Sequence, residues 1–346
     1  MSVVTPTGDN ELLGQAVAMR KISRLERLLG PDNYRVLQGL LKTPASIVGS
    51  LLIILFVLVA LGAPILAPPL NPNDPYTIPR DGFKAQPRPP GTEWRVKPPP
   101  LPFWWEAVTG KKGWVHLLGT SQGQYDLYYG IIWGTRTAFK TGIIVVLATV
   151  VIGVVIGSVS AYYGGLLDNI LMRIVDVLII LPSLMATLIL AAVLTPMLGR
   201  TTLPAMIALI AFGWMGYARI IRGDILSVKE RDYVMAARVI GAQDRRILFR
   251  HIIPNAIFPT LVLASLGIGD VVLAFAALSF LGIGTDLGYA DWGQVLSFAR
   301  NWMTSLDTYW YIIVYPGIAL VLFVMGWNLL GDALRDVLDP RLRGKV

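Results

Sequence analysis

Few residues of this chain could carry out chemistry on a bound substrate. Its 346 residues include no cysteine, which excludes disulfides, thiolate metal ligands and thiol nucleophiles. The two histidines, His116 and His251, leave little from which to build a metal cluster. The sequence therefore indicates neither redox chemistry nor a bound metal.

A phosphate-binding loop is also missing from the sequence. The pattern Gly-x-x-x-x-Gly-Lys-Ser/Thr, which cradles nucleotide phosphates, does not occur. Lys111 and Lys112 follow Gly110, but no upstream glycine or hydroxyl residue completes a cradle. We expect no cofactor in this chain, so that any ATP and Mg²⁺ would be bound by another subunit.

Charged and aromatic residues near apolar segments are the remaining candidates. Asp270 either lines a pathway and meets the amino group of a substrate, or forms a hydrogen bond to a neighbouring helix. Arg173 and Asp176, three residues apart, are predicted to pair locally. In the amphipathic stretch 286–302, Trp292 lies either at the mouth of a pathway or in an interfacial aromatic belt.

The elements that position these residues are apolar helices. The chain is 54% hydrophobic and 15% charged, with a mean hydropathy of +0.60, which is typical of a membrane protein. Because about 20 residues span a bilayer, six spans are predicted, at 45–67, 138–161, 170–194, 203–221, 257–283 and 309–330. The predicted fold class is an all-α polytopic membrane protein with six transmembrane helices.

Two sequence details refine these spans. Pro182 and Pro204 are expected to kink or begin helices. Gly153 and Gly157, continued by Ala161, form a small-residue face that predicts close packing between two helices.

Orientation follows from the positions of lysine and arginine in short loops. Basic residues number six before the first span, eight from Arg219 to Arg250 and four in the tail, against one in each short loop on the other side. Both termini and 219–250 should therefore face the cytoplasm. Because topology accounts for most of the net charge of +8, no nucleic-acid partner is predicted.

This topology divides the chain into a series of segments. The Pro-rich outer loop is predicted to be extended and semi-rigid, either as a simple connection or as a surface for an external partner. The segments are a cytoplasmic N-terminal segment (1–44), the first transmembrane helix (45–67), an extracellular loop (68–135), a five-helix core (136–331) with a cytoplasmic loop at 222–256, and a cytoplasmic tail (332–346).

The loop at 222–256 carries the densest pattern in the sequence. Tyr233, Ala236, Ala237 and Ile240 follow the i, i+3, i+4, i+7 spacing of an amphipathic helix. Gly241 is predicted to end that helix in a left-handed conformation. A second helical stretch follows and is interrupted by a proline. The predicted structure is two short helices with a sharp bend, which either insert into a partner protein or lie on anionic lipid.

The spacing of this loop resembles the EAA motif of ABC importer permeases. Ala236 and Ala237, three residues, Gly241 and twelve residues to Pro254 match that motif, although Met235 stands where the family has glutamate. The resemblance is greatest to dipeptide and oligopeptide (DppC/OppC-like) permeases, and it extends over three further stretches: HLLGTSQGQYDLYYGIIWGTRTAF from 116, LSFLGIG at 278–284 and NLLGDALRDVLDPRLRG at 328–344.

The resemblance implies a type I ABC importer transmembrane-domain (MetI-like) fold in the cell membrane. It implies a second, related permease as a heterodimer partner, two ATPase subunits and an extracellular solute-binding protein. In the family, the loop at 233–255 is the coupling helix that docks on the ATPase. The coupling residues it implies are Asp232, Tyr233, Ala236, Ala237, Gly241, Ala242, Arg245, Arg250 and Pro254.

Two other functional classes, a secondary transporter and a membrane enzyme, explain fewer features of the sequence. A secondary transporter would show internal repeats or broken helices and an intramembrane ion-coupling cluster, whereas Asp270 stands alone. A membrane enzyme would gather catalytic residues on one side, but His116 and His251 are predicted on opposite sides. Within the ABC permease interpretation, peptides are the expected cargo, and oligosaccharides, opines and nickel complexes are the alternatives.

Overall fold

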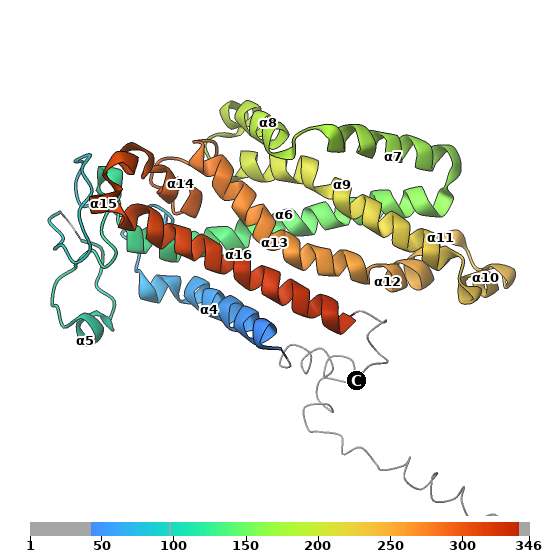
Figure 1. The fold of residues 1–346 in the computed structure, drawn as a ribbon, viewed down its shortest axis with the longest axis horizontal. Coiled ribbons are helices and arrows are strands. Elements are labelled where there is room, and N and C mark those ends of the chain that lie inside the picture. Colours follow the sequence, from blue (N-terminus) through green and yellow to red (C-terminus); the bar gives the residue numbers. More distant parts are fainter. Residues whose placement is uncertain (1–42, 97, 339–346) are drawn as a thin grey trace, which may run out of the picture.

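The computed structural model describes residues 43–96 and 98–338, and all regular elements in these residues are helices (Figure 1). Predictions for the remaining parts of the N-terminal segment and the tail lie outside the described residues. Five helices are long and apolar enough to cross a membrane, and a bent pair supplies a sixth span when counted as one. The five are α4 (Pro44–Leu66), α6 (Leu127–Tyr163), α9 (Thr202–Lys229), α13 (Phe258–Phe280) and α16 (Tyr311–Leu338).

The third predicted span, 170–194, is not one straight helix. It is divided between α7 (Gly165–Ile180) and α8 (Ser183–Leu198), which meet at 90°. Pro182 lies in the break, and Leu181 before it is extended, with φ −67° and ψ 133°. A residue before proline avoids the helical region, so the chain turns here although both halves are apolar.

Several helices extend beyond the hydrophobic runs. α6 begins eleven residues earlier than predicted, because Asp126 caps it by accepting a hydrogen bond from the Tyr129 N–H at 2.9 Å. Its 37 residues correspond to about 55 Å of helix, which is longer than a bilayer core. α9 likewise continues to Lys229, so that residues 222–229 belong to this helix and not to the following loop.

The bundle is closely packed where α6 meets α9. A Cβ atom added at Gly157 would lie 2.3 Å from the carbonyl oxygen of Ala218, and one added at Gly153 would lie 2.6 Å from Cβ of Tyr217. Side chains at these positions would force the helices apart. The predicted close packing by small residues is therefore confirmed.

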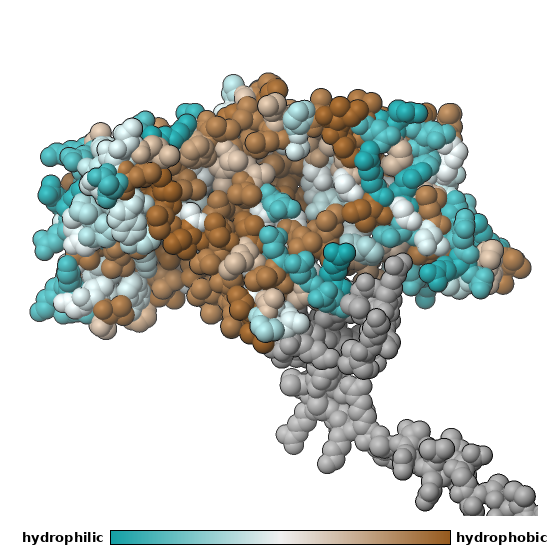
Figure 2. Space-filling model, in the orientation of Figure 1, coloured by the Kyte–Doolittle hydropathy of each residue, from teal (hydrophilic) through white to brown (hydrophobic). Residues whose placement is uncertain are grey.

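Apolar side chains cover much of the outside of the bundle. Figure 2 shows a broad hydrophobic band around the middle, with hydrophilic residues at both ends. On α4, for example, Leu58 and Leu61 are 62% and 71% exposed. A surface of this kind is stable in lipid or against other apolar helices, which agrees with a multi-pass membrane protein.

Residues 68–126, which we call the cap, cover the end of the bundle where α4 ends (Figure 1). The predicted extended run is instead a folded layer, because aromatic rings provide it with a core: Trp105 and Trp114 are buried with ring centroids 4.0 Å apart. The cap contains the short helix α5 (Trp105–Thr109) and the 3₁₀ turn η1 (Gln122–Gln124). Ile78 donates a backbone hydrogen bond to Gly288 at 2.7 Å, which ties the cap to the segment after α13.

That segment completes the same end of the molecule. It contains α14 (Trp292–Ser297), the 3₁₀ helix η3 (Arg300–Ser305) and α15 (Leu306–Tyr309). At the opposite end, beside the end of α6 and the start of α7, lie residues 230–256, which we call the foot (Figure 1). These form α10 (Asp232–Val239), α11 (Asp244–Ile247), the π-helical turn η2 (Leu248–Ile252) and α12 (Ile253–Ala256).

Candidate functional site

The foot projects beyond the long helices at the end opposite the cap (Figure 1). Its bend has the geometry of a Schellman motif: Ala242 N–H donates to the carbonyl of Ala237, and Gly241 N–H donates to the carbonyl of Arg238, both at 3.0 Å. Gly241 has φ +80°, the left-handed conformation that the motif requires. The glycine four residues after Ala237 is therefore explained by the backbone: the helix end needs a residue with positive φ at this position.

Substitutions at Gly241 should destabilise the C-terminal end of α10. The destabilisation should increase with the free-energy cost of a positive φ for the new residue. No atom lies within 4 Å of a Cβ added there, so the effect is purely one of backbone conformation, about 1–2 kcal/mol for most residues. We expect amide hydrogen exchange in α10 to accelerate slightly in Gly241→Asn, more in Gly241→Ala and most in Gly241→Val. Gly216→Ala, at an equally open site in α9 with no positive φ, should leave exchange in α10 unchanged. Equal exchange in all three Gly241 variants would contradict this prediction.

A buried apolar cluster fixes the foot to the ends of α6 and α9. Val234 and Ala237 enter it from α10, and Ile247 and Ile252 enter it from the second half of the foot. The remaining buried members are Ala161, Tyr162, Ile221, Ile225, Leu248 and Ala256. Because packed cores transmit displacement rather than absorb it, the foot and these helix ends should move together.

Polar contacts reinforce the same junction. Tyr162 OH donates a hydrogen bond to Asp244 at 2.5 Å. Lys229 Nζ donates to the carbonyl oxygens of Ala161 and Tyr162, at 3.2 and 2.8 Å. A lysine in this position satisfies the unpaired carbonyls of the last turn of α6 and complements its dipole.

The residues predicted for this site are divided between the inside and the outside of the foot. Ala237 faces the buried cluster and Ala242 is half-buried, whereas Ala236 and Tyr233 on the predicted stripe are exposed. Asp232, Gly241, Arg245, Arg250 and Pro254 are also exposed. The charged members therefore remain available to a partner.

Two neighbouring apolar residues at the end of α10, which we call the tip of the foot, are exposed together. The sequence pattern did not indicate this exposed pair. Val239 is 87% exposed and Ile240 is 83% exposed, and Met235 adds to the exposed apolar surface of α10. In the second half of the foot, a cavity of about 380 Å³ is lined by Gln243, Arg245, Arg246 and Phe249. Apolar side chains next to arginines suit a protein partner with an apolar groove and acidic groups.

The two pathway candidates have different environments. Asp270 is exposed on α13. Trp292 is 2% exposed, packs against Phe56 and Phe323, and donates from Nε1 to the carbonyl of Ile131 at 3.1 Å. Trp292 is therefore a core residue of the bundle and cannot line a pathway in this conformation.

The predicted pairing of Arg173 with Asp176 is wrong. Asp176 instead accepts a hydrogen bond from Arg219 of α9 at 2.5 Å. One turn further along α9, Arg222 binds both carboxylate oxygens of Asp168, at 2.7 and 2.6 Å. Both pairs connect α7 to α9, so tertiary contacts replace the local pair.

An apolar groove lies between α13, α16 and the segment after α13. Its volume is about 480 Å³. Leu273 and Phe280 line one wall, and the Arg300 guanidinium lies 5.1 Å from the centre of the Phe280 ring. Asp270, one turn before Leu273 on α13, is not among the residues that line the groove.

Asp291, the N-cap of α14, is a buried carboxylate. Its Oδ1 accepts from Gly293 N–H at 2.9 Å, while Oδ2 has no partner among the described residues. Burial raises the pKa of Asp291 to about 6. The folded protein therefore retains this proton at pH values where the unfolded chain has lost it.

Asp291 should consequently make stability fall as pH rises from about 4 to 6. A pKa raised from 3.8 to about 6 corresponds to a contribution of about 3 kcal/mol to the free energy of unfolding. This contribution is present below pH 4 and is lost fully above pH 6. We expect Asp291→Asn, which keeps the cap, to match the wild type near pH 4 and to melt at a higher temperature at pH 7. The measurement is thermal unfolding, followed by tryptophan fluorescence, from pH 4 to pH 7. A difference in melting temperature between the two proteins that does not change with pH would contradict this prediction.

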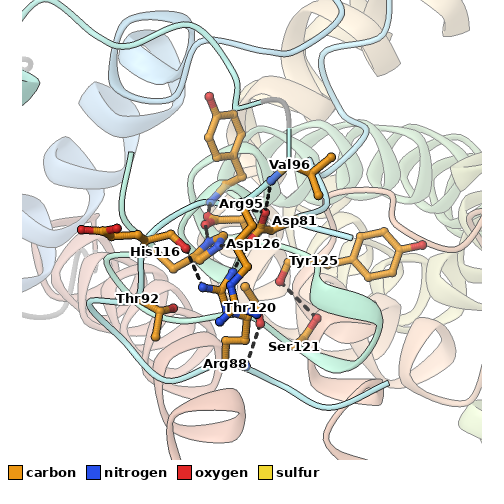
Figure 3. Close-up of polar contacts among 12 residues, drawn as sticks. Asp81, Arg88, Thr92, Arg95, Val96, His116, Thr120, Ser121, Tyr125 and Asp126 are labelled. Atoms are coloured by element: carbon orange, nitrogen blue, oxygen red, sulfur yellow. Dashed lines mark hydrogen bonds and ion pairs between the residues drawn. The ribbon is translucent and has the colours of Figure 1, made fainter. Parts of the chain in front are cut away.

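His116 lies at the centre of a buried polar network in the cap (Figure 3). Its Nδ1 is 2.6 Å from Asp126 and its Nε2 is 3.2 Å from Asp81. Asp81 also pairs with Arg88 and accepts the backbone N–H groups of Arg95 and Val96, at 2.6 and 2.7 Å. The network joins the cap loops to the first residue before α6.

This network ties the loops of the cap together. Within the described ranges, no group of three or more potential ligands could hold a metal ion. His116 belongs to the cap and His251 to the foot, at opposite ends of the molecule (Figure 1). Sequence reasoning missed Asp81 and Asp126 as partners of His116, because nothing in their spacing marks them.

Comparisons with known proteins match most of the chain. A family model described as "Binding-protein-dependent transport system inner membrane component" matches residues 150–344. The dipeptide transport system permease protein DppC of Haemophilus influenzae is 33% identical over 295 residues, covering 85% of this chain and 91% of that protein.

Two further relatives are matched over about two thirds of this chain. The probable D,D-dipeptide transport system permease protein DdpC of Escherichia coli is 38% identical, over 66% of this chain and 75% of its own. The glutathione transport system permease protein GsiD of Pectobacterium atrosepticum is 36% identical, over 66% and 73%. With more than half of its length matched by the family model, and with five apolar spans and a bent helix pair in its fold, the chain belongs to the inner membrane components of binding-protein-dependent transport systems.

Proposed function

We propose that the chain is one permease subunit of an ATP-driven importer of peptides. The observation that carries this proposal is the foot: an apolar tip at Val239 and Ile240, flanked by arginines, held outside the long helices on a packed junction. The names of the relatives, which transport dipeptides, D,D-dipeptides and glutathione, support the peptide substrate. The foot and both termini face the cytoplasm, and the cap faces the outside.

The foot transmits movement from an ATPase subunit to the spans. Nucleotide binding closes the ATPase pair and displaces the foot, whose buried cluster carries the ends of α6 and α9 with it. Ile257, between α12 and α13, is itself in the right-handed helical region, so the displacement also passes into α13. Rigid-body tilting of these helices alternates access to the pathway, provided that each nucleotide state favours one arrangement.

Partners supply what this chain does not carry. Two ATPase subunits bind ATP and Mg²⁺ and perform the hydrolysis, and this chain contributes no catalytic residue. A second, related permease covers the exposed faces and completes the pathway, and a solute-binding protein delivers the cargo at the cap end. Lipid surrounds the rest of the apolar band, and no nucleic acid takes part.

Asp270 lines the pathway and binds the amino group of the peptide. A carboxylate exposed in the middle of a span is costly in lipid, so its face of α13 turns toward water or protein. Asp270→Asn should reduce uptake of a peptide with a free amino group about tenfold, the loss of one charge-assisted hydrogen bond. Asp270→Glu should retain more uptake, and identical initial rates for both variants and the wild type would contradict this role.

The test of the function is transport by the reconstituted complex. The tagged chain should co-purify with a second permease and two ATPase subunits. In proteoliposomes with the solute-binding protein, a labelled peptide should accumulate and ATP hydrolysis should rise. Binding and uptake of oligosaccharides, opines or nickel complexes without peptides would overturn the substrate, and uptake without any ATPase subunit would overturn the mechanism.

A further inference from the structure

Aromatic side chains gather around the end of α4, the first of the apolar spans. Trp133 Nε1 donates to the carbonyl of Ala67 at 2.8 Å, and Tyr128 OH donates to that of Leu66 at 2.9 Å. Trp104 Nε1 donates to the carbonyl of Ile65 at 3.1 Å. Indole and phenol groups that bind the last carbonyls of a span are typical of the membrane interface.

Trp104 belongs to the cap and brings the short helix α5 to the end of α4. It immediately precedes α5, and its indole reaches back to α4 over 39 residues of sequence. Trp105 holds the other side of α5 inside the cap: it is 1% exposed, and its Nε1 donates to the carbonyl of Gly113 at 3.1 Å. α5 is thus fixed between the cap core and the end of the first span.

The remaining side of α5 exposes apolar side chains. Val108 is 73% exposed and lies one turn after Trp104, whose carbonyl its N–H bonds at 3.1 Å, so the two share a helix face. Phe103 is 87% exposed. Figure 2 shows a separate hydrophobic patch at the lower left, where Figure 1 draws α5, apart from the central band.

Two lysines follow this apolar surface. Lys111 and Lys112 are exposed, and neither forms an ion pair with a carboxylate among the described residues. Gly110, with φ +67°, ends α5 and turns the chain before them. Apolar side chains followed by cations at the level of the interface match the two parts of an anionic phospholipid surface, the acyl boundary and the phosphates.

We propose that residues 101–112 are a membrane-surface anchor, which inserts Phe103 and Val108 into the interface and places Lys111 and Lys112 at anionic headgroups. The anchor holds the cap at a constant height and angle over the bundle. It requires only that α4 span the bilayer, and it is independent of the proposed substrate and coupling.

The natural absence of cysteine permits a clean test by single-cysteine spin labelling. Phe103→Cys and Val108→Cys probe the proposed lipid-facing side. Glu106→Cys is the matched control for position 108, because Glu106 is exposed on α5 two residues before Val108, on a different face of the helix. The assembled transporter is placed in nanodiscs of phosphatidylethanolamine and phosphatidylglycerol, and collisions of the label with oxygen and with a water-soluble nickel chelate are measured.

We expect the ratio of oxygen to nickel accessibility to be several-fold higher at positions 103 and 108 than at 106. Equal ratios at the three positions would show a solvent-exposed helix and overturn the anchor. Suppression of both collisions at 103 and 108 would show that a protein partner covers α5, which also overturns it. Omitting phosphatidylglycerol, or combining Lys111→Gln with Lys112→Gln, should reduce the difference; an unchanged ratio would overturn the headgroup contact.

Discussion

Replacing Ile240 by aspartate is expected to release the ATPase subunits and abolish uptake while the chain stays folded in the membrane. Ile240 is 83% exposed and belongs to none of the buried apolar clusters among the described residues. Burial of such a side chain in an interface stabilises it by about 2 kcal/mol, and a carboxylate in its place costs more. Affinity for the ATPase should therefore fall at least about thirtyfold.

The measurement is the amount of ATPase that co-purifies with the tagged permease, together with the rate of substrate-stimulated ATP hydrolysis. Ile240→Leu keeps an apolar side chain and should retain both. Leu287→Asp makes the same chemical change at a residue 72% exposed at the opposite end of the molecule, and it should retain the ATPase. Full retention of the ATPase by Ile240→Asp would remove the tip of the foot from the coupling interface.

Replacing His116 by alanine is expected to unfold the cap while leaving the bundle intact. The substitution leaves Asp81 and Asp126 buried without the imidazole that bridges them. Breaking a buried, charged network by removing one member costs about 3–5 kcal/mol. Since the network fastens the cap loops to the start of α6, the loss should be local.

Limited proteolysis with trypsin measures this effect. Cleavage after Lys84 and Arg95 should become fast in His116→Ala, with cleavage of the foot unchanged. Thr92→Ala, which removes a hydroxyl that donates only to the carbonyl of Pro89 at 2.9 Å, should behave as the wild type. An unchanged cleavage pattern in His116→Ala would show that the cap does not depend on this network.

The features predicted correctly are those that depend on neighbouring residues in the sequence. Apolar runs long enough to cross a bilayer locate the spans, and Gly241 marks the bend because a positive φ is a property of one residue. Gly153 and Gly157 indicated close helix packing because their spacing of four residues places both on one face of a helix, which can be read from the local sequence. The boundaries of α6 and α9 were less predictable, because both helices extend past the apolar runs into polar sequence.

The features predicted incorrectly depend on partners distant in the sequence. Trp292 is placed in the core by Phe56 and Phe323, and Asp176 is drawn to Arg219, 43 residues away. The cap was expected to be extended because of its prolines, yet its tryptophans bury one another. Local pattern carries no information about such contacts.

By itself, the sequence determined that this is a helical membrane protein without thiol chemistry or a nucleotide loop, with a bent basic loop at 233–255. Only the tertiary structure decided which side of α10 is buried, which carboxylates meet His116 and where α5 lies. The physical reason is that hydrophobicity and backbone conformation act over a few residues, whereas burial and hydrogen bonding require the folded neighbours to be in place.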